Sequence, residues 1–182
     1  MKSFGGFYKG RKYRSILEIK WAIFFDYLGW LYEYEPFGLK GWIPDFALYG
    51  TDGQIILVEV KPITAIDYKV CNKISKADDG EHELLLLGLS PLNESKSWYS
   101  PALGWLTESK MGMDIWGPDW GHAMFNANQR YGFFHEHNSY RDRITGEGDG
   151  DNHLILPSWD DIEMLWNQAS NKAQWIKQEG LT

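Results

Sequence analysis

The sequence predicts a mixed α/β fold, in which one central sheet is flanked by helices. The first observation is the segment 15–28, whose apolar side chains recur at the spacing of a helix. The second is the segment 54–60, which is apolar on both faces, as a central buried strand is. The third is a helix-like segment at 63–77 that leads to another apolar strand at 83–89. Helices that alternate with buried strands in this way are typical of an α/β domain.

Composition limits the class of protein. The chain has 182 residues, enough for one domain over 1–182, and its 43% of hydrophobic and 24% of charged residues are typical of a folded protein. It contains no apolar run long enough to cross a bilayer, and we expect no secretory signal. The single cysteine, Cys71, excludes a disulfide framework, so a reducing, cytoplasmic location is expected.

The charge is unevenly distributed. A net charge of −7 argues against a protein that grips nucleic acid over its whole surface. Residues 1–20, however, carry six basic residues and one acidic residue. This basic edge on an acidic body is compatible with phosphate contacts at that edge. We interpret residues 1–12, in which glycines alternate with aromatic and basic residues, as a flexible basic arm.

The first helix and the strand after it carry clear boundary signals. Ser15 with Glu18 three residues later forms a capping-box pattern, which predicts the start of the helix. Gly29 is expected to end it. The segment 31–35 then alternates apolar and charged residues, which is typical of a half-buried strand.

The remaining elements follow in order. A strand is predicted over 43–49, and a turn at 50–53 leads into the central strand, which Pro62 ends. The helix and strand that follow complete a core over 13–90. We interpret residues 91–157 as an irregular, aromatic-rich insert. A C-terminal helix is predicted over 158–179, because a capping serine precedes acidic residues in its first turn.

The most informative residues are Asp45, Glu59 and Lys61. If 51–53 form a three-residue hairpin loop with Gly53 in the left-handed conformation, Asp45 lies opposite Glu59. Glu59 and Lys61 then share one face of the strand. Two unpaired buried carboxylates would cost several kcal/mol each, and Mg²⁺ or Mn²⁺ would offset that cost. Lys61 would orient or deprotonate a water molecule, or neutralise a phosphate, in metal-assisted phosphodiester hydrolysis.

These residues also resemble a known family. Glu18 on a helix, Pro44-Asp45 on a strand and Glu59-Val60-Lys61 on the next strand are similar to the PD-(D/E)XK nuclease superfamily, over about half of the chain. The resemblance implies a restriction-endonuclease-like core, with the order helix, three strands, helix, strand. It implies a DNA nuclease of phage or mobile-element type, and it allows a homodimer. Asp45 and Glu59 would be metal ligands, Lys61 the catalytic lysine, and Glu18 a metal or water ligand from the helix.

Other residues have both a functional and an ordinary interpretation. Basic side chains could contact phosphates or form a solvated surface; they are Lys9, Arg11, Lys12, Arg14, Lys69, Lys73 and Lys76. The tryptophans of 98–120 could stack on bases or pack in a core. His135, Glu136, His137 and His153 could bind a metal, but surface or core roles are favoured.

Two other function classes stay open. One is a nuclease-fold protein without catalysis, which binds nucleic acid or inhibits a protein that processes it. The other is a structural or assembly protein that uses the aromatic segment as an interface. The first would leave Asp45, Glu59 and Lys61 without a catalytic role, and the second predicts an oligomer with no metal affinity.

Overall fold

The computed structural model describes residues 5–78, 80–93, 101–107, 119–137, 141–146, 148 and 155–179. The helices and strands within these residues, in chain order, are β1 (Gly6–Tyr8), β2 (Arg11–Tyr13), α1 (Ile16–Leu28), β3 (Leu31–Tyr34), β4 (Phe46–Tyr49), β5 (Ile55–Val60), α2 (Tyr68–Asp78), β6 (Glu83–Leu87), β7 (Ala102–Thr107), β8 (Trp120–Asn126), β9 (Gly132–His135) and α3 (Trp159–Glu179). The predicted mixed α/β class is confirmed.

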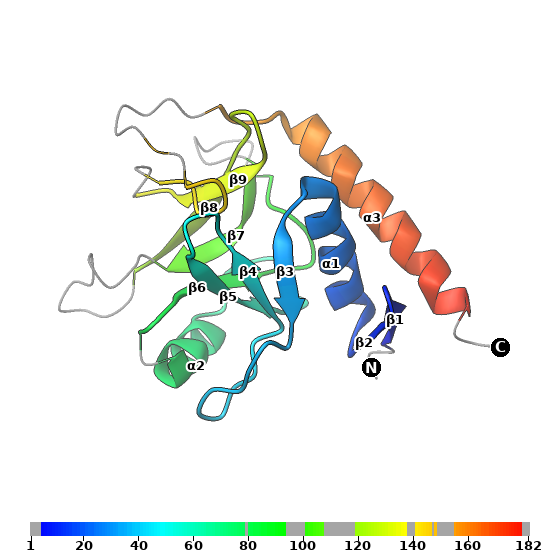
Figure 1. The fold of residues 1–182 in the computed structure, drawn as a ribbon, viewed down its shortest axis with the longest axis horizontal. Coiled ribbons are helices and arrows are strands. Elements are labelled where there is room, and N and C mark those ends of the chain that lie inside the picture. Colours follow the sequence, from blue (N-terminus) through cyan, green and yellow to red (C-terminus); the bar gives the residue numbers. More distant parts are fainter. Residues whose placement is uncertain are drawn as a thin grey trace.

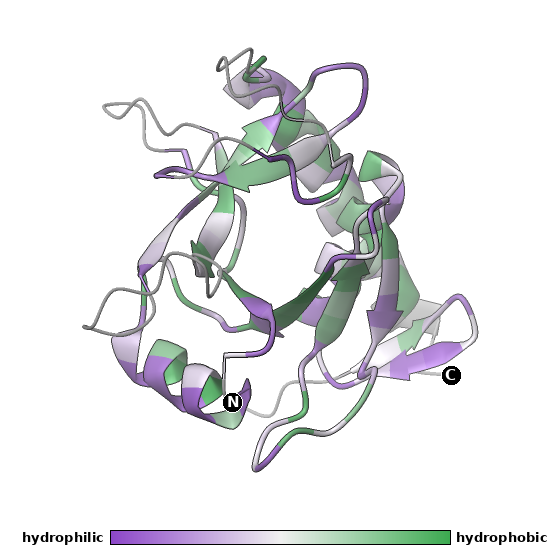
Figure 2. Cartoon of the chain, turned by 60° about the vertical axis from the view of Figure 1, so that its left-hand side comes forward, coloured by the Kyte–Doolittle hydropathy of each residue, from purple (hydrophilic) through white to green (hydrophobic). Residues whose placement is uncertain are grey.

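One seven-stranded sheet organises the fold, with strands β3 to β9 lying side by side in chain order (Figure 1). Strands β5 and β6 pair in parallel and are joined through α2, whereas every other pairing among the described strands of this sheet is antiparallel. Helices α1 and α3 cover one face, and α2 covers the other. Figure 2 shows apolar residues along the central strands and hydrophilic residues on α2.

Helix α1 has the predicted boundaries. Ser15 is its N-cap and forms a complete capping box with Glu18, and Gly29 ends it in the left-handed conformation with φ 72°. Trp21, Phe24 and Phe25 are fully buried in the core that α1 forms with the sheet and α3. The ring of Trp166 on α3 lies 4.5 Å from that of Trp21 and 5.5 Å from that of Phe24. The contacts of Trp166 with Trp21 and Phe24 therefore stabilise the packing of α3 on α1.

The hairpin of β4 and β5 has the predicted register. The Gly50 N–H donates to the Gln54 carbonyl at 2.9 Å, and Gly53 has a φ of 82°. Phe46 lies opposite Val58. The strand begins three residues later than predicted, because Pro44 has no N–H to donate to a neighbouring strand.

Helix α2 also begins later than predicted, at 68 rather than 63. The Asp67 carboxylate accepts the Lys69 N–H at 2.9 Å and so acts as the N-terminal cap. The C-terminal helix keeps its predicted start, and the Ser158 hydroxyl accepts the Asp161 N–H at 3.2 Å.

The prediction of a flexible arm was wrong for residues 6–12. These residues form most of the hairpin of β1 and β2, with Lys9 and Gly10 as a two-residue turn in which both φ angles are positive. Tyr8 is buried, and its hydroxyl donates to Asp26 of α1 at 2.6 Å. The burial of Tyr8 thus holds the hairpin of β1 and β2 against α1, although the glycines and charges of this segment suggested a flexible arm. Residues 1–4 of the predicted arm lie outside the described residues.

The prediction of an irregular insert was also wrong for 102–107, 120–126 and 132–135, because β7, β8 and β9 extend the central sheet. The glycine at 104 is needed where β7 approaches β6, since a Cβ there would lie 2.4 Å from the Leu86 carbonyl oxygen. That glycine weakened the apolar pattern in the sequence. Trp105 is buried beside Leu86 and Cys71, which confirms the core interpretation for this residue. Trp98 and Trp116 lie outside the described residues.

A further finding concerns membranes. In the part of the chain that the structure describes, no helix combines the length and the apolar run needed to cross a bilayer.

The packing of α3 on α1 generates a stability prediction. Trp166→Ala removes a side chain that is 8% exposed and lies between two aromatic rings, so we expect it to lower the free energy of unfolding by about 3–5 kcal/mol. Trp175 on the same helix is 68% exposed. The matched control Trp175→Ala should change stability by less than about 0.5 kcal/mol. Urea unfolding of the two variants measures the difference, and equal losses would contradict the packing role of Trp166.

Candidate active site

Two buried carboxylates meet where β4 and β5 pair. The register of Phe46 with Val58 places Asp45 opposite Glu59, as the sequence predicted. Both side chains are buried, at 4% and 6% exposure. Ala47, two residues beyond Asp45, packs under α2, and alternation along the strands puts the carboxylates toward the same face. The hairpin therefore brings two candidate metal ligands together.

Asp45 is held by a donor on each oxygen. The Val60 N–H donates to Oδ2 at 2.7 Å, at the end of β5 where β4 has no further residue to pair. The Arg14 guanidinium donates to Oδ1 through Nη2 at 2.8 Å. One donor is main chain and fixes the carboxylate, and the other is a cationic side chain from the segment before α1.

Glu59 also accepts one hydrogen bond from a neutral donor and one from a cationic side chain, and here both donors are side chains. The Trp42 indole N–H donates to Oε2 at 2.7 Å, and the Lys61 ammonium donates to Oε1. Trp42 is buried in the loop between β3 and β4 and packs against the core under α2. The sequence analysis missed this residue. The available signal was a tryptophan three residues before Asp45, because a buried indole N–H needs an acceptor.

The charge of Glu59 perturbs Asp45. The pKa of Asp45 is raised to about 7, first by burial, then by the charge of Glu59 and, to a smaller extent, by the charge of Glu18. The Val60 N–H and the Lys61 ammonium act in the opposite direction. A further positive charge beside Asp45 and Glu59 would reduce the repulsion between the two carboxylates. This is the electrostatic property expected of a cation site.

Glu18 has a confirmed structural role. Its Oε2 accepts the Arg14 N–H at 3.0 Å and the Tyr34 hydroxyl at 2.7 Å, and its Oε1 accepts the Ser15 hydroxyl at 2.8 Å. The capping interpretation is therefore confirmed. Its role as a metal or water ligand stays a prediction, although its charge reaches Asp45.

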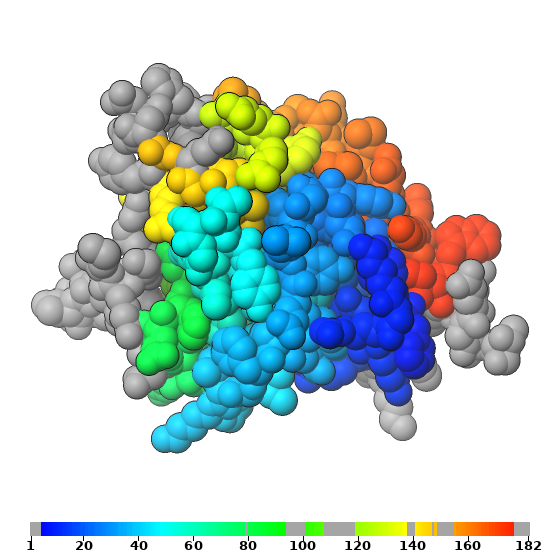
Figure 3. Space-filling view, viewed as in Figure 1, coloured from blue at the N-terminus to red at the C-terminus, as the bar shows by residue number. Residues whose placement is uncertain are grey.

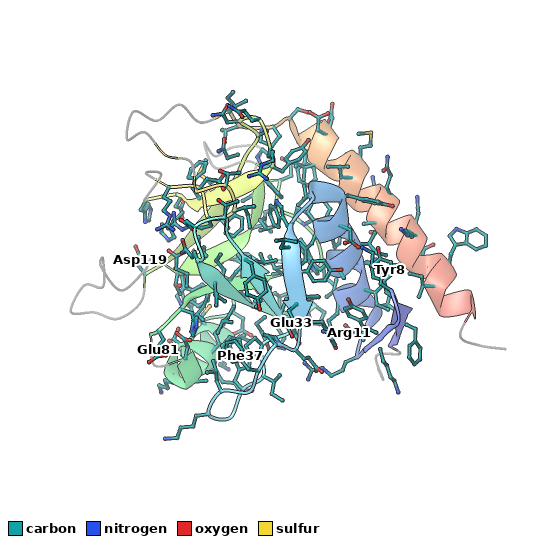
Figure 4. The ribbon with its side chains drawn as sticks, viewed as in Figure 1. Tyr8, Arg11, Glu33, Phe37, Glu81 and Asp119 are labelled. Atoms are coloured by element: carbon teal, nitrogen blue, oxygen red, sulfur yellow. The ribbon has the colours of Figure 1, made fainter. Side chains whose placement is uncertain are left out.

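The predicted phosphate-binding residues lie in two groups. Arg14 belongs to the site of Asp45 and Glu59, because its guanidinium forms an ion pair with Asp45. Through Nε, at 2.8 Å, the same guanidinium also pairs with Glu35. Figure 4 shows Arg11 beside β3, where its guanidinium donates to the Tyr34 carbonyl at 2.7 Å. The remaining side chains are exposed on the hairpin or on α2; they are Lys9, Lys12, Lys69, Lys73 and Lys76. Their contact with phosphate stays a prediction.

The donor set fits a hard divalent cation. Asp45 and Glu59 each offer a carboxylate, and Mg²⁺ commonly takes one or two carboxylates with water and phosphate oxygens as its other ligands. Within the described ranges, no group of three or more His, Cys, Asp or Glu side chains is arranged to hold a metal. That finding supports neither the histidine alternative at 135–137 nor a set of three carboxylates that includes Glu18, and His153 lies outside the described residues. Two adjacent carboxylates are a donor set that a Mg²⁺ or Mn²⁺ ion could use.

Comparison of the chain with protein-family models, with curated proteins and with solved structures gives no match. The interpretation of the site consequently depends on the chemistry of its own residues.

The raised pKa of Asp45 predicts how pH changes stability in the metal-free protein. Because this pKa is higher in the folded state than its ordinary value of 3.8, the folded protein binds more protons between about pH 4 and pH 7. The stability contributed by the protonated form is therefore lost as pH rises through this window. Asp45→Asn cannot ionise, so at about pH 8 in EDTA we expect it to be more stable than wild type by on the order of 1–2 kcal/mol.

Urea unfolding at about pH 4 and about pH 8 measures this effect, and the advantage of Asp45→Asn should shrink at the lower pH. Asp160→Asn, at the exposed start of α3, is the control and should stay within about 0.5 kcal/mol of wild type at both. A variant of Asp45 that is less stable than wild type at the higher pH would mean that Arg14 and Val60 fully compensate the charge.

Proposed function

We propose that the protein is a Mg²⁺- or Mn²⁺-dependent nuclease of the PD-(D/E)XK type that hydrolyses phosphodiester bonds in DNA. The observation that carries the proposal is the pair of buried carboxylates, Asp45 and Glu59, with the Lys61 ammonium on Glu59. The order α1, β3, β4, β5, α2, β6 supports it, because it is the order helix, three strands, helix, strand of a restriction-endonuclease-like core. An endonuclease of phage or mobile-element type, acting in the cytoplasm, is the subclass that we propose.

Each residue of the site has a distinct role in this proposal. Asp45 and Glu59 would hold the metal, while the Val60 N–H and the Trp42 indole keep the two carboxylates oriented. When bound, the metal supplies charge for the phosphate oxygens and lowers the pKa of a water molecule. Lys61, whose ammonium donates to Glu59, would orient that water, take up its proton or neutralise the phosphate.

The charge distribution indicates how DNA would approach. The body of the protein is acidic, so phosphates would favour the side that carries the basic hairpin and Arg14. In Figure 3 the hairpin, β3 and the loop that follows β3 lie next to each other on one face. A homodimer would present two such faces, which is the arrangement required to cut both strands of a duplex.

One observation favours a second candidate, a protein of this fold that binds nucleic acid or a protein partner without catalysis. Every carboxylate oxygen of Asp45 and Glu59 already accepts a hydrogen bond from the chain itself. A site compensated in this way does not require a metal for folding. The two candidates differ in one measurable property, which is metal-dependent cleavage.

Cleavage assays test the proposal directly. We expect the purified protein to cut DNA with Mg²⁺ or Mn²⁺, to be inactive in EDTA, and to lose at least about 10²-fold in rate in Lys61→Ala and Glu59→Gln. Supercoiled plasmid, linear duplex and single-stranded DNA are compared as substrates. Lys40→Ala, which removes an exposed lysine from the loop before Trp42, is the matched control and should cleave like wild type.

Folded protein that binds Mn²⁺ and cleaves none of these substrates would favour the second candidate. Cleavage that survives in Lys61→Ala would contradict the assignment of the catalytic lysine.

Glu18→Gln separates the two interpretations of Glu18. Glutamine can replace glutamate in a capping box but carries no charge. Because Oε1 and Oε2 already accept bonds from Ser15, Arg14 and Tyr34, we expect the variant to keep its cleavage rate within about tenfold of wild type. We also expect a loss of about 0.5–2 kcal/mol in stability. A fall in rate as large as that of Glu59→Gln, in a folded variant, would instead assign Glu18 to the metal.

A further inference from the structure

The donors on the two candidate metal ligands are of two kinds. The Val60 N–H and the Trp42 indole are parts of the sheet and of the buried core, and they cannot leave. The other two oxygens, Oδ1 of Asp45 and Oε1 of Glu59, are occupied by the Arg14 guanidinium and the Lys61 ammonium. Each carboxylate thus has one fixed neutral donor and one cationic side chain.

The two cationic side chains are partly exposed to solvent. The Arg14 side chain is 55% exposed and the Lys61 side chain is 38% exposed. The main chain of Arg14 is anchored separately, because its N–H donates to the Glu18 carboxylate at 3.0 Å and to the Tyr34 hydroxyl at 3.0 Å. The guanidinium can therefore swing away from Asp45 while the hairpin and α1 keep their positions.

A divalent cation and these side chains compete for the same oxygens. A metal bound through Oδ1 of Asp45 and Oε1 of Glu59 would lie within a few ångströms of both positive groups, where like charges repel strongly. The fixed donors leave those two oxygens as the ones that can be vacated. A carboxylate oxygen has a second lone pair for a metal, but the repulsion between the metal and the two cationic groups favours a metal-bound state in which Arg14 and Lys61 have left the carboxylates.

We propose that the Arg14 guanidinium neutralises the charge of Asp45 in the metal-free protein. When a divalent cation binds, the guanidinium leaves Asp45 and then binds a phosphate of the substrate. Lys61 makes the same exchange at Glu59. This inference rests on the proposed function and adds a coupling to it. Metal binding releases the guanidinium for the phosphate, and phosphate binding draws it from Asp45, so each ligand increases the affinity for the other.

Arginine suits this exchange better than lysine would. Its planar fork already bridges two carboxylates, through Nη2 to Asp45 and Nε to Glu35, both at 2.8 Å. The same fork binds two oxygens of a phosphate. Glu35 therefore keeps the guanidinium in an ion pair while it moves from Asp45 to a phosphate.

The test measures Mn²⁺ affinity by electron paramagnetic resonance, with and without a phosphorothioate DNA duplex that keeps its charge and resists hydrolysis. It is run at about pH 8, above the pKa of about 7 for Asp45, so that protons do not compete with the metal. Wild type is compared with Arg14→Gln, with Arg14→Lys, and with Arg130→Gln. Arg130 is exposed between β8 and β9, which makes its variant a matched control for the loss of one arginine charge.

We expect DNA to tighten Mn²⁺ binding to wild type and to Arg130→Gln by about tenfold, within the usual range of coupled sites. Arg14→Gln should bind Mn²⁺ about 3–10-fold more tightly than wild type without DNA, because no guanidinium has to be displaced, and DNA should add little. Arg14→Lys keeps the charge without the fork, so it should show intermediate coupling. Thermal unfolding of each metal-free variant verifies that it is folded.

Two results would overturn the inference, and they are distinguishable. If Arg14→Gln binds Mn²⁺ like wild type and DNA tightens both equally, Arg14 is not exchanged for metal, while the proposed nuclease stands. If wild type binds no Mn²⁺ at all, the proposed function fails and the exchange fails with it.

Discussion

The antiparallel pairing of β4 with β5 is the constraint on which the site depends. The three-residue turn at 51–53 fixes its register, and the parallel pairing of β5 with β6 fixes the other edge of β5. Because side chains alternate along a strand, a slip of one residue would turn Glu59 toward α1 and bring Val58 to the other face. The position of two carboxylates at one sheet end is thus a consequence of turn geometry.

Charge compensation is the second requirement of this arrangement. Two adjacent buried carboxylates are unfavourable unless each is hydrogen-bonded and neutralised. The structure meets this with four donors from three parts of the chain: Val60 and Lys61 at the end of β5, Trp42 in the loop before β4, and Arg14 before the start of α1. The same arrangement that allows the pair to be buried also leaves two oxygens covered only by partly exposed cationic side chains, which links the stability of the fold to the chemistry that we propose.

Local sequence signals predicted the elements best where a single physical rule dominates. The capping box at Ser15 and the left-handed glycine at the end of α1 depend on hydrogen bonds within a few residues, and both were correct. The strands β7 to β9 were missed because their glycines resemble loop residues, although Gly104 is there to let two strands approach closely. The hairpin of β1 and β2 was missed because its stability comes from burying Tyr8 against a helix that begins later in the sequence.

By itself, the sequence determined the mixed α/β class, the register of the β4–β5 hairpin and the meeting of Asp45 with Glu59, since each follows from short-range periodicity and turn chemistry. Only the tertiary structure decided which groups hold those carboxylates. Arg14 reaches Asp45 across 31 residues and Trp42 reaches Glu59 across 17. Such contacts depend on how α1, the sheet and the loop before β4 pack together, and no local pattern encodes a distance between elements.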